Sequence, residues 1–235
     1  MKKDIIVLGI HDGHNAGAAL IKNGSVAAAL QEERLNNIKN YSGTPINAIR
    51  AVFDIAKVDP SDVDAIAIAG LVHSHAPLKE RPLHVKLYER YAGLFKYHTA
   101  NSLLIKALHK QRQMTELKSE FTKQGIADKP ITFIEHHVAH AASVYYQRPW
   151  TDDTLVLTLD GAGDGLCSTV SIGRKYTLER VASTTAYNSP GNIFYSEITG
   201  YLGLKRWEHE YKVMGMAPYG ISDYCIDEIR KIVRI

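Results

Sequence analysis

Three histidines lie within five positions of the segment FIEHHVAHAASVYY, residues 133–146. If a helix begins near Glu135, His136 and His140 stand at i and i+4 on one face, the spacing at which two imidazoles can grip one metal ion. His137 then points elsewhere, toward a hydrogen-bond partner or a substrate. The alanines around His140 keep this helix slim, so that another element can approach it closely. An isolated HxxxH is more often a polar helix turn, so the metal interpretation needs a third ligand.

A candidate for that third ligand follows the next apolar strand. Asp160 comes directly after DTLVLTL, residues 153–159, at the point where the strand would end. In a two-lobed fold this strand should lie near the histidine helix. Two imidazoles and one carboxylate are a donor set that holds divalent transition metals. We therefore predict a divalent metal site formed by His136, His140 and Asp160.

Two short segments rich in glycine and aspartate could approach an anion. DGHNAG, residues 12–17, and DGAGDG, residues 160–165, each follow a predicted strand. Glycines let backbone N–H groups approach a phosphate, and a carboxylate can hold a cation that bridges phosphates. Either segment alone is more often a simple turn. Their equivalent places in a repeated plan favour two lobes that clasp a nucleotide. The candidate cofactor-binding residues in the second segment are Gly161, Gly163, Asp164 and Gly165.

The elements that must position these residues follow a repeated β-β-β plan. Strands are predicted at 4–10, 16–21 and 25–33, and again within 153–185. A helix over 44–58, a buried strand over 62–70 and a strand over 131–135 complete the first unit. The sequence therefore predicts an α/β fold with a duplicated β-β-β-α-β-α plan. Residues 1–150 would form the first lobe, and residues 151–235 would start a second lobe that is incomplete.

Composition places limits on the partners and on the compartment. Lysine and arginine number 28 and aspartate and glutamate 25 among 235 residues, an excess too small to imply a nucleic-acid partner. Residues 78–125 form a helical and basic excursion, for which a solvated surface is favoured over a nucleic-acid face. No stretch approaches the roughly 20 apolar residues that span a membrane. Cys167 and Cys225 offer neither a disulfide framework nor a zinc pattern, and we expect a cytoplasmic protein.

Four stretches resemble the O-carbamoyltransferases of the nodulation and antibiotic-tailoring type. GIHDGHNAGAALIKNG resembles the opening strand, loop and hairpin of that family, and EERLNNIKN resembles its EERFxRxKH segment. HHVAHAASVYY with LDGAGDG resembles its metal helix and second phosphate loop. GNIFYSEITGYLGLKRWEHEYKVMGMAPYG resembles the stretch that ends in EYKVMGLAPYG. The core domain of the family is similar to the tRNA threonylcarbamoyl-transfer protein, which belongs to the actin and Hsp70 superfamily.

The resemblance implies a fold, a reaction and site residues. The fold would be the ribonuclease-H-like, actin-like ATPase fold. The reaction would be ATP-dependent transfer of a carbamoyl group from carbamoyl phosphate, through carbamoyl adenylate, to a small hydroxyl-bearing acceptor. The metal at His136, His140 and Asp160 would be Fe²⁺ or, as alternatives, Zn²⁺ or Mn²⁺. His14 falls on the histidine of the first loop, a candidate base for the acceptor hydroxyl. The segment along the nucleotide would include Glu210, Lys212 and Gly215.

The sequence also departs from the family pattern and leaves alternatives open. Asn15, Gly17, Asn37 and Asn40 stand where the family has an aspartate, a small hydroxyl residue, a basic residue and a histidine. Family members continue past residue 235 with the rest of the second lobe, a further metal-ligand aspartate and a domain that makes carbamoyl adenylate. The alternatives are a tRNA threonylcarbamoyl-transfer protein and a catalytically silent module that binds nucleotide or metal. The sequence leaves the oligomeric state open.

Overall fold

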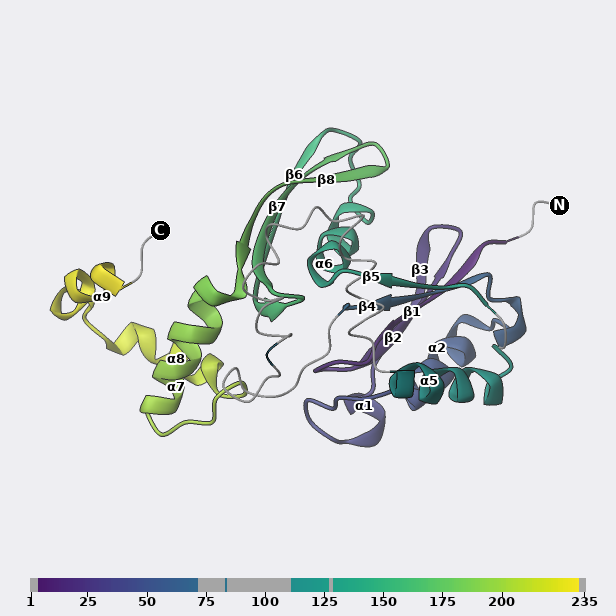
Figure 1. Cartoon of the computed structure of the whole chain (residues 1–235), viewed down its shortest axis with the longest axis horizontal. Coiled ribbons are helices and arrows are strands. Elements are labelled where there is room, and N and C mark those ends of the chain that lie inside the picture. The colour runs from purple at the N-terminus through teal and green to yellow at the C-terminus, as the bar shows by residue number, and fades with distance from the viewer. Residues whose placement is uncertain (1–3, 72–82, 84–110, 127–128, 233–235) are drawn as a thin grey trace.

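The computed structural model describes residues 4–71, 83, 111–126 and 129–232. Two β-sheets with helix α6 between them dominate the fold, and the two chain ends lie at opposite ends of the molecule (Figure 1). The strands are β1 (Ile6–His11), β2 (Gly17–Lys22), β3 (Ser25–Gln31), β4 (Ala65–Ala69), β5 (Ile131–Ile134), β6 (Thr154–Gly163), β7 (Leu166–Arg174) and β8 (Thr177–Thr185). The α-helices are α1 (Glu33–Asn36), α2 (Ile46–Ala56), α5 (Gln111–Lys123), α6 (His136–Tyr145), α7 (Ser196–Tyr201), α8 (Glu210–Met216) and α9 (Ile226–Ile232).

The first sheet has the strand order β3-β2-β1-β4-β5. β1, β2 and β3 pair antiparallel as consecutive hairpins, whereas β4 pairs parallel with β1 and β5 pairs parallel with β4. The parallel pairs place the carboxyl ends of β1, β4 and β5 at one edge of the sheet. Residues that follow these strands, including the loop after β1 and the start of α6 after β5, therefore gather at that edge.

The main core lies between this sheet and α2 and α5. Ile6, Leu8 and Ile10 of β1 are buried because alternate side chains of a strand share one face. α2 presents a helical stripe to them, with Ile49 and Val52 fully buried. The predicted helix over 44–58 and the predicted strand over 62–70 are confirmed, with ends a few residues shorter than expected.

The second sheet repeats the antiparallel part of the first. Its order is β6-β7-β8, and α6 packs against β6 and β7 through Ala141 and Tyr145. The turn between β7 and β8 falls at Lys175 and Tyr176. Gly173 and Arg174 pair within β7, and the Tyr145 ring packs over Gly173.

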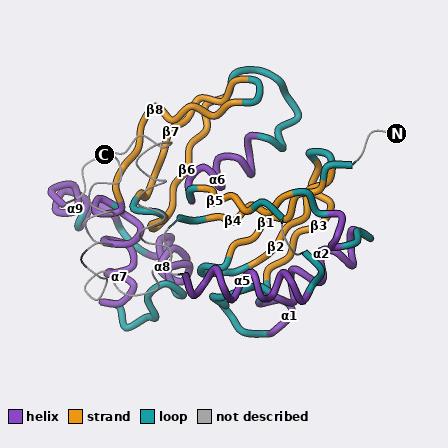
Figure 2. The backbone as a smooth tube through the Cα atoms, turned by 45° about the vertical axis from the view of Figure 1, so that its right-hand side comes forward, coloured by secondary structure: helices purple, strands orange, loops and turns teal. Residues whose placement is uncertain are grey.

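The residues after β8 form short helical segments that lead away from the sheets (Figure 2). A π-helical turn at Pro190–Tyr195 runs into α7, and α8 and α9 follow. Helical turns thus cover Pro190–Tyr201 and Glu210–Tyr219. Most of the basic excursion over 78–125 lies outside the described residues, and its end forms α5. Among the described residues, no helix combines the length and the apolar character needed to span a bilayer.

The order of strands identifies the fold. A three-stranded antiparallel meander followed by two parallel strands, with a second meander later in the chain, is the ribonuclease-H-like plan of the actin-like ATPases. The predicted α/β class and the duplicated plan are therefore confirmed. Within the described residues, the second unit contains the counterparts of β1, β2 and β3 and no counterpart of β4 or β5.

Candidate metal centre

The three predicted metal ligands lie together where α6 meets β6. Asp160 Oδ2 lies 2.5 Å from His136 Nε2 and 3.6 Å from His140 Nε2, and the two Nε2 atoms are 3.0 Å apart. One ligand atom from each residue falls within 4.8 Å of the others. The i and i+4 spacing on α6 supplies the two imidazoles, and the strand supplies the carboxylate, as the sequence predicts.

The charges of this cluster show what holds it together without a metal. Hydrogen bonds from His136 and His140 hold the pKa of Asp160 far below its usual range. Burial alone would lower the pKa of His136, but the hydrogen bond and the negative charge of Asp160 outweigh burial and raise it. The carboxylate of Asp160 therefore favours positive charge at this point, and a divalent cation would also supply that charge.

The donor set fits a divalent transition metal. Two imidazole nitrogens and a carboxylate oxygen are ligands that iron, zinc and manganese accept, whereas magnesium and calcium prefer oxygen ligands alone. The two Nε2 atoms 3.0 Å apart face each other, so at least one must carry a proton or both must face a cation. His140 and Asp160 are exposed enough for exchange with solvent, since their side chains retain 54% and 36% of their accessible surface.

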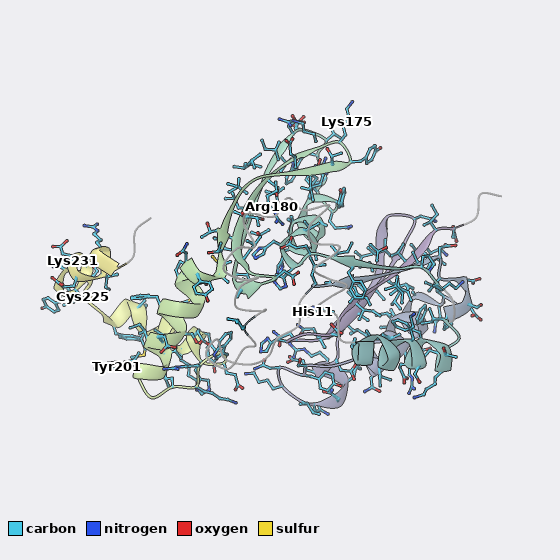
Figure 3. The ribbon with its side chains drawn as sticks, viewed as in Figure 1. His11, Lys175, Arg180, Tyr201, Cys225 and Lys231 are labelled. Carbon is cyan, nitrogen blue, oxygen red and sulfur yellow. The ribbon has the colours of Figure 1, made fainter. Side chains whose placement is uncertain are left out.

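Two buried carboxylates hold the first turn of α6. Glu135 is the N-cap residue and accepts hydrogen bonds from the backbone N–H groups of His137 and Val138. It is 2% exposed and pairs with Arg180 of β8, which is labelled on the second sheet in Figure 3. These contacts fix the end of the helix that carries His136. The acidic residue directly before the histidine pair was the sequence signal for this cap.

The carboxylate of Asp164, a residue predicted to belong to a phosphate loop, accepts hydrogen bonds from the backbone of the protein itself. Its carboxylate accepts hydrogen bonds from the backbone N–H of Leu71, at 2.8 and 2.9 Å, and from the N–H of His136, at 2.7 Å. Asp164 and Gly165 form the two-residue turn between β6 and β7, both with positive φ, as expected of an Asp-Gly hairpin. Asp164 thus joins the end of β4, the start of α6 and the second sheet.

Two of the glycines of DGAGDG contact the candidate metal ligands directly. A Cβ atom on Gly163 would lie 2.1 Å from the Cγ and Cδ2 atoms of His136, so only glycine leaves room for that ring. Gly161 donates its N–H to Asp160 Oδ1 and accepts a hydrogen bond from the Ser189 hydroxyl at its carbonyl. The segment is mostly strand β6, with a register shift between Leu159 and Gly163.

His14 lies in the loop after β1, where the side chain is exposed. Its backbone forms an isolated bridge with Ser42, and its carbonyl oxygen lies 3.0 Å from Nε2 of His11. His11 is the histidine of this loop whose ring faces the cluster, with its centroid 6.5 Å from that of His136. Sequence reasoning missed His11, although its place as the last residue of β1 was the available signal.

The residues that depart from the family pattern fit the local backbone geometry. Asn15, Asn37 and Asn40 have φ values of 62°, 59° and 56°, a left-handed conformation that asparagine tolerates better than most residues. A Cβ atom at Gly17 would lie 2.7 Å from the carbonyl oxygen of Leu30 on β3. Each departing residue therefore suits its own backbone position.

The residues predicted along the nucleotide lie apart from this cluster on α8. Lys212 Nζ is 3.1 Å from His209 Nε2, and Glu210 accepts a hydrogen bond from the N–H of Trp207. Gly215 is exposed, and a Cβ atom there would meet nothing within 4 Å. The structure does not bring these three residues into contact with His136, His140 or Asp160, and their role stays a prediction.

Comparisons with known proteins agree with these features. Residues 6–234 match the family model described as "Carbamoyltransferase N-terminus". The nodulation protein NolNO of Sinorhizobium fredii is 31% identical over 207 residues, which cover 88% of this chain and 28% of NolNO. An uncharacterized Synechocystis protein, sll1178, is 33% identical over 217 residues, which cover 90% of this chain and 34% of sll1178. The chain thus spans about a third of the length of the curated relatives that it matches.

A solved structure, YeaZ from Pseudomonas aeruginosa, overlaps with 77% of this chain and 68% of its own, at 11% identity and a TM-score of 0.37. Because the TM-score and the identity are low, the fold is identified from the strand order of the chain itself.

Proposed function

The chain belongs to the carbamoyltransferase family through its N-terminal domain, and from that premise we propose that it supplies the metal-binding transfer site of an ATP-dependent O-carbamoyltransferase. The observation that supports this proposal most directly is the convergence of His136, His140 and Asp160 on one point. A catalytically silent metal-binding module would need the same three ligands, and the transfer assay below distinguishes that alternative from the enzyme.

The proposed reaction is the transfer of a carbamoyl group from carbamoyl adenylate to a hydroxyl of a small acceptor. The acceptor oxygen forms a bond to the carbonyl carbon, and the bond from that carbon to the phosphate oxygen of AMP breaks. AMP leaves with the bonding electron pair, and the acceptor gives up its hydroxyl proton. Carbamoyl adenylate would itself form in two steps: water cleaves carbamoyl phosphate to carbamate and phosphate, and carbamate then displaces pyrophosphate from ATP.

The residues of this chain would divide the work. His136, His140 and Asp160 would hold a divalent ion, Fe²⁺ in the first place, which supplies a Lewis acid beside the reacting carbonyl. His14 would accept the proton of the acceptor, because an imidazole nitrogen can act as a general base and this side chain is exposed to substrate in the loop after β1. Glu210, Lys212 and Gly215 would border the nucleotide.

The test compares two carboxylates that lie close together in the sequence. Asp160→Asn removes the proposed carboxylate ligand, whereas Asp153→Asn makes the same change at an exposed residue that pairs with Arg174 at 3.1 Å. Each protein is loaded anaerobically with Fe²⁺, and the bound metal is measured by plasma mass spectrometry after desalting. We expect wild type and Asp153→Asn to retain about one equivalent and Asp160→Asn to lose most of it.

Transfer is followed as AMP release from carbamoyl adenylate, with glycerol as the acceptor probe. Removal of a ligand or of the base should lower the rate, by about 10²–10⁴-fold for His14→Asn. Equal metal content in Asp160→Asn and Asp153→Asn would refute the metal site. A different result would separate the two proposals. If the wild type binds metal and Asp160→Asn does not, but both release AMP at the same rate, the transfer function is refuted and the metal site is not.

A further inference from the structure

His137 lies between the two metal-ligand histidines in the sequence but has a different environment. It is 0% exposed, and its Nδ1 lies 2.8 Å from the hydroxyl oxygen of Thr158 on β6. Its Nε2 is buried and has no hydrogen-bond partner among the described residues. Among the described residues, the Thr158 hydroxyl is the side-chain hydrogen-bond partner of this buried imidazole.

The hydroxyl that contacts His137 belongs to a small buried network. Thr158 Oγ1 accepts a hydrogen bond from the backbone N–H of Thr169 at 3.1 Å and lies 2.7 Å from the Thr169 hydroxyl. Thr158 and Thr169 are 7% and 2% exposed. One lone pair and one proton of Thr158 remain after the backbone bond, and they suffice for His137 and for the Thr169 hydroxyl. The Thr158 hydroxyl can therefore form all of these hydrogen bonds at once, and they fix its orientation toward His137.

The place of this contact relative to the metal ligands gives it a consequence. Thr158 and Asp160 are two residues apart on β6, and both side chains contact histidines of α6, Thr158 at His137 and Asp160 at His136. His137 follows His136 directly on α6. The contact therefore joins the helix that carries two ligands to the strand that carries the third, within one residue of His136 and one strand repeat of Asp160.

We propose that His137 is a positioning residue that, through its hydrogen bond to Thr158, sets the distance between the two histidine ligands on α6 and Asp160 on β6. This inference rests on the proposed metal site. Metal ligands tolerate displacements of only about 0.2 Å, so a small relaxation of helix against strand weakens binding. Groups that orient ligands in this way typically change metal affinity by about 10–100-fold when they are removed.

The experiment uses the 235-residue chain and Co²⁺, whose visible absorption reports ligand number and geometry. His137→Phe keeps a ring in the pocket and removes the hydrogen bond, and Thr158→Val removes the hydroxyl at nearly constant volume. Thr199→Val is the matched control, because Thr199 is also buried and donates a hydrogen bond, to the Tyr195 carbonyl of the π-helical turn, at 2.9 Å. Circular dichroism shows whether each variant is folded. If His137→Phe does not fold, the result with Thr158→Val is the test of the inference.

We expect both test variants to bind Co²⁺ about 10–100-fold more weakly than wild type, with an altered absorption spectrum, and Thr199→Val to match wild type. The double variant should be no weaker than the weaker single variant, because both remove one shared interaction. The inference would be overturned if Thr158→Val bound Co²⁺ with wild-type affinity and spectrum while His140→Ala did not bind it. Co²⁺ binding that is the same in wild type and His140→Ala would instead overturn the metal site and this inference with it.

Discussion

Gly163→Ala should damage the proposed metal centre without removing any of its three candidate ligands. The added Cβ atom would lie 2.1 Å from two carbons of the His136 ring, whereas carbon atoms in contact keep about 3.5 Å apart. The ring must therefore retreat by about 1.4 Å, several times the displacement of about 0.2 Å that a metal–ligand bond tolerates. If β6 moves in place of the ring, Asp160 moves with it, because both residues belong to that strand.

The assay is competition for Zn²⁺ against a chromophoric chelator at fixed pH. Gly163→Ala should lose at least about tenfold in zinc affinity, with circular dichroism unchanged. Gly9→Ala is the matched control, since Gly9 lies inside β1 and a Cβ atom there meets the Ala19 carbonyl oxygen at an ordinary 3.6 Å. Zinc affinity in Gly163→Ala equal to that of Gly9→Ala would refute the argument that this glycine makes room for His136.

Two further predictions concern buried groups away from the ligands themselves. Arg180→Met leaves the carboxylate of Glu135, which is 2% exposed, without its cation. The free energy of unfolding measured by urea titration should therefore fall by about 3–5 kcal/mol. Adding Glu135→Gln to the same chain should recover part of this loss, and a double variant whose loss is the sum of the two single losses would contradict the pairing. Cys167 is 3% exposed, and burial raises the pKa of its thiol, whereas Cys225 is exposed. Iodoacetamide at pH 8 should therefore label only Cys225 in the folded protein and both cysteines in urea. Mass spectrometry that finds both cysteines labelled at the same rate in the folded protein would contradict the burial of Cys167.

The fold and the ligand cluster were accessible from the sequence because both depend on short-range pattern. Alternating apolar residues predicted β1 and β6, and the i and i+4 spacing predicted that His136 and His140 share a face of α6. Asp160 joined them because a repeated strand plan placed its strand near that helix. These inferences need only the period of the elements and their order.

The parts that the sequence could not provide depend on contacts between distant residues. Asp164 and Gly163 looked like a phosphate loop, since nothing local shows that the carboxylate would accept from Leu71, 93 positions away. The same holds for Thr158, whose partner His137 is known only once α6 is packed on β6. His11 and His14 could not be ranked either, because their directions depend on the loop between β1 and β2.

The packing of α6 also determines how the chain could be divided. α6 follows the last strand of the first sheet, yet its buried residues Ala141 and Tyr145 pack with Val156 of the second. A cut at residue 150 would leave both imidazole ligands on one fragment and Asp160 on the other. Neither piece could bind the ion with all three ligands alone, and each would expose the surface that fits its partner. We therefore expect the two fragments to associate, and we expect a divalent ion to strengthen that association.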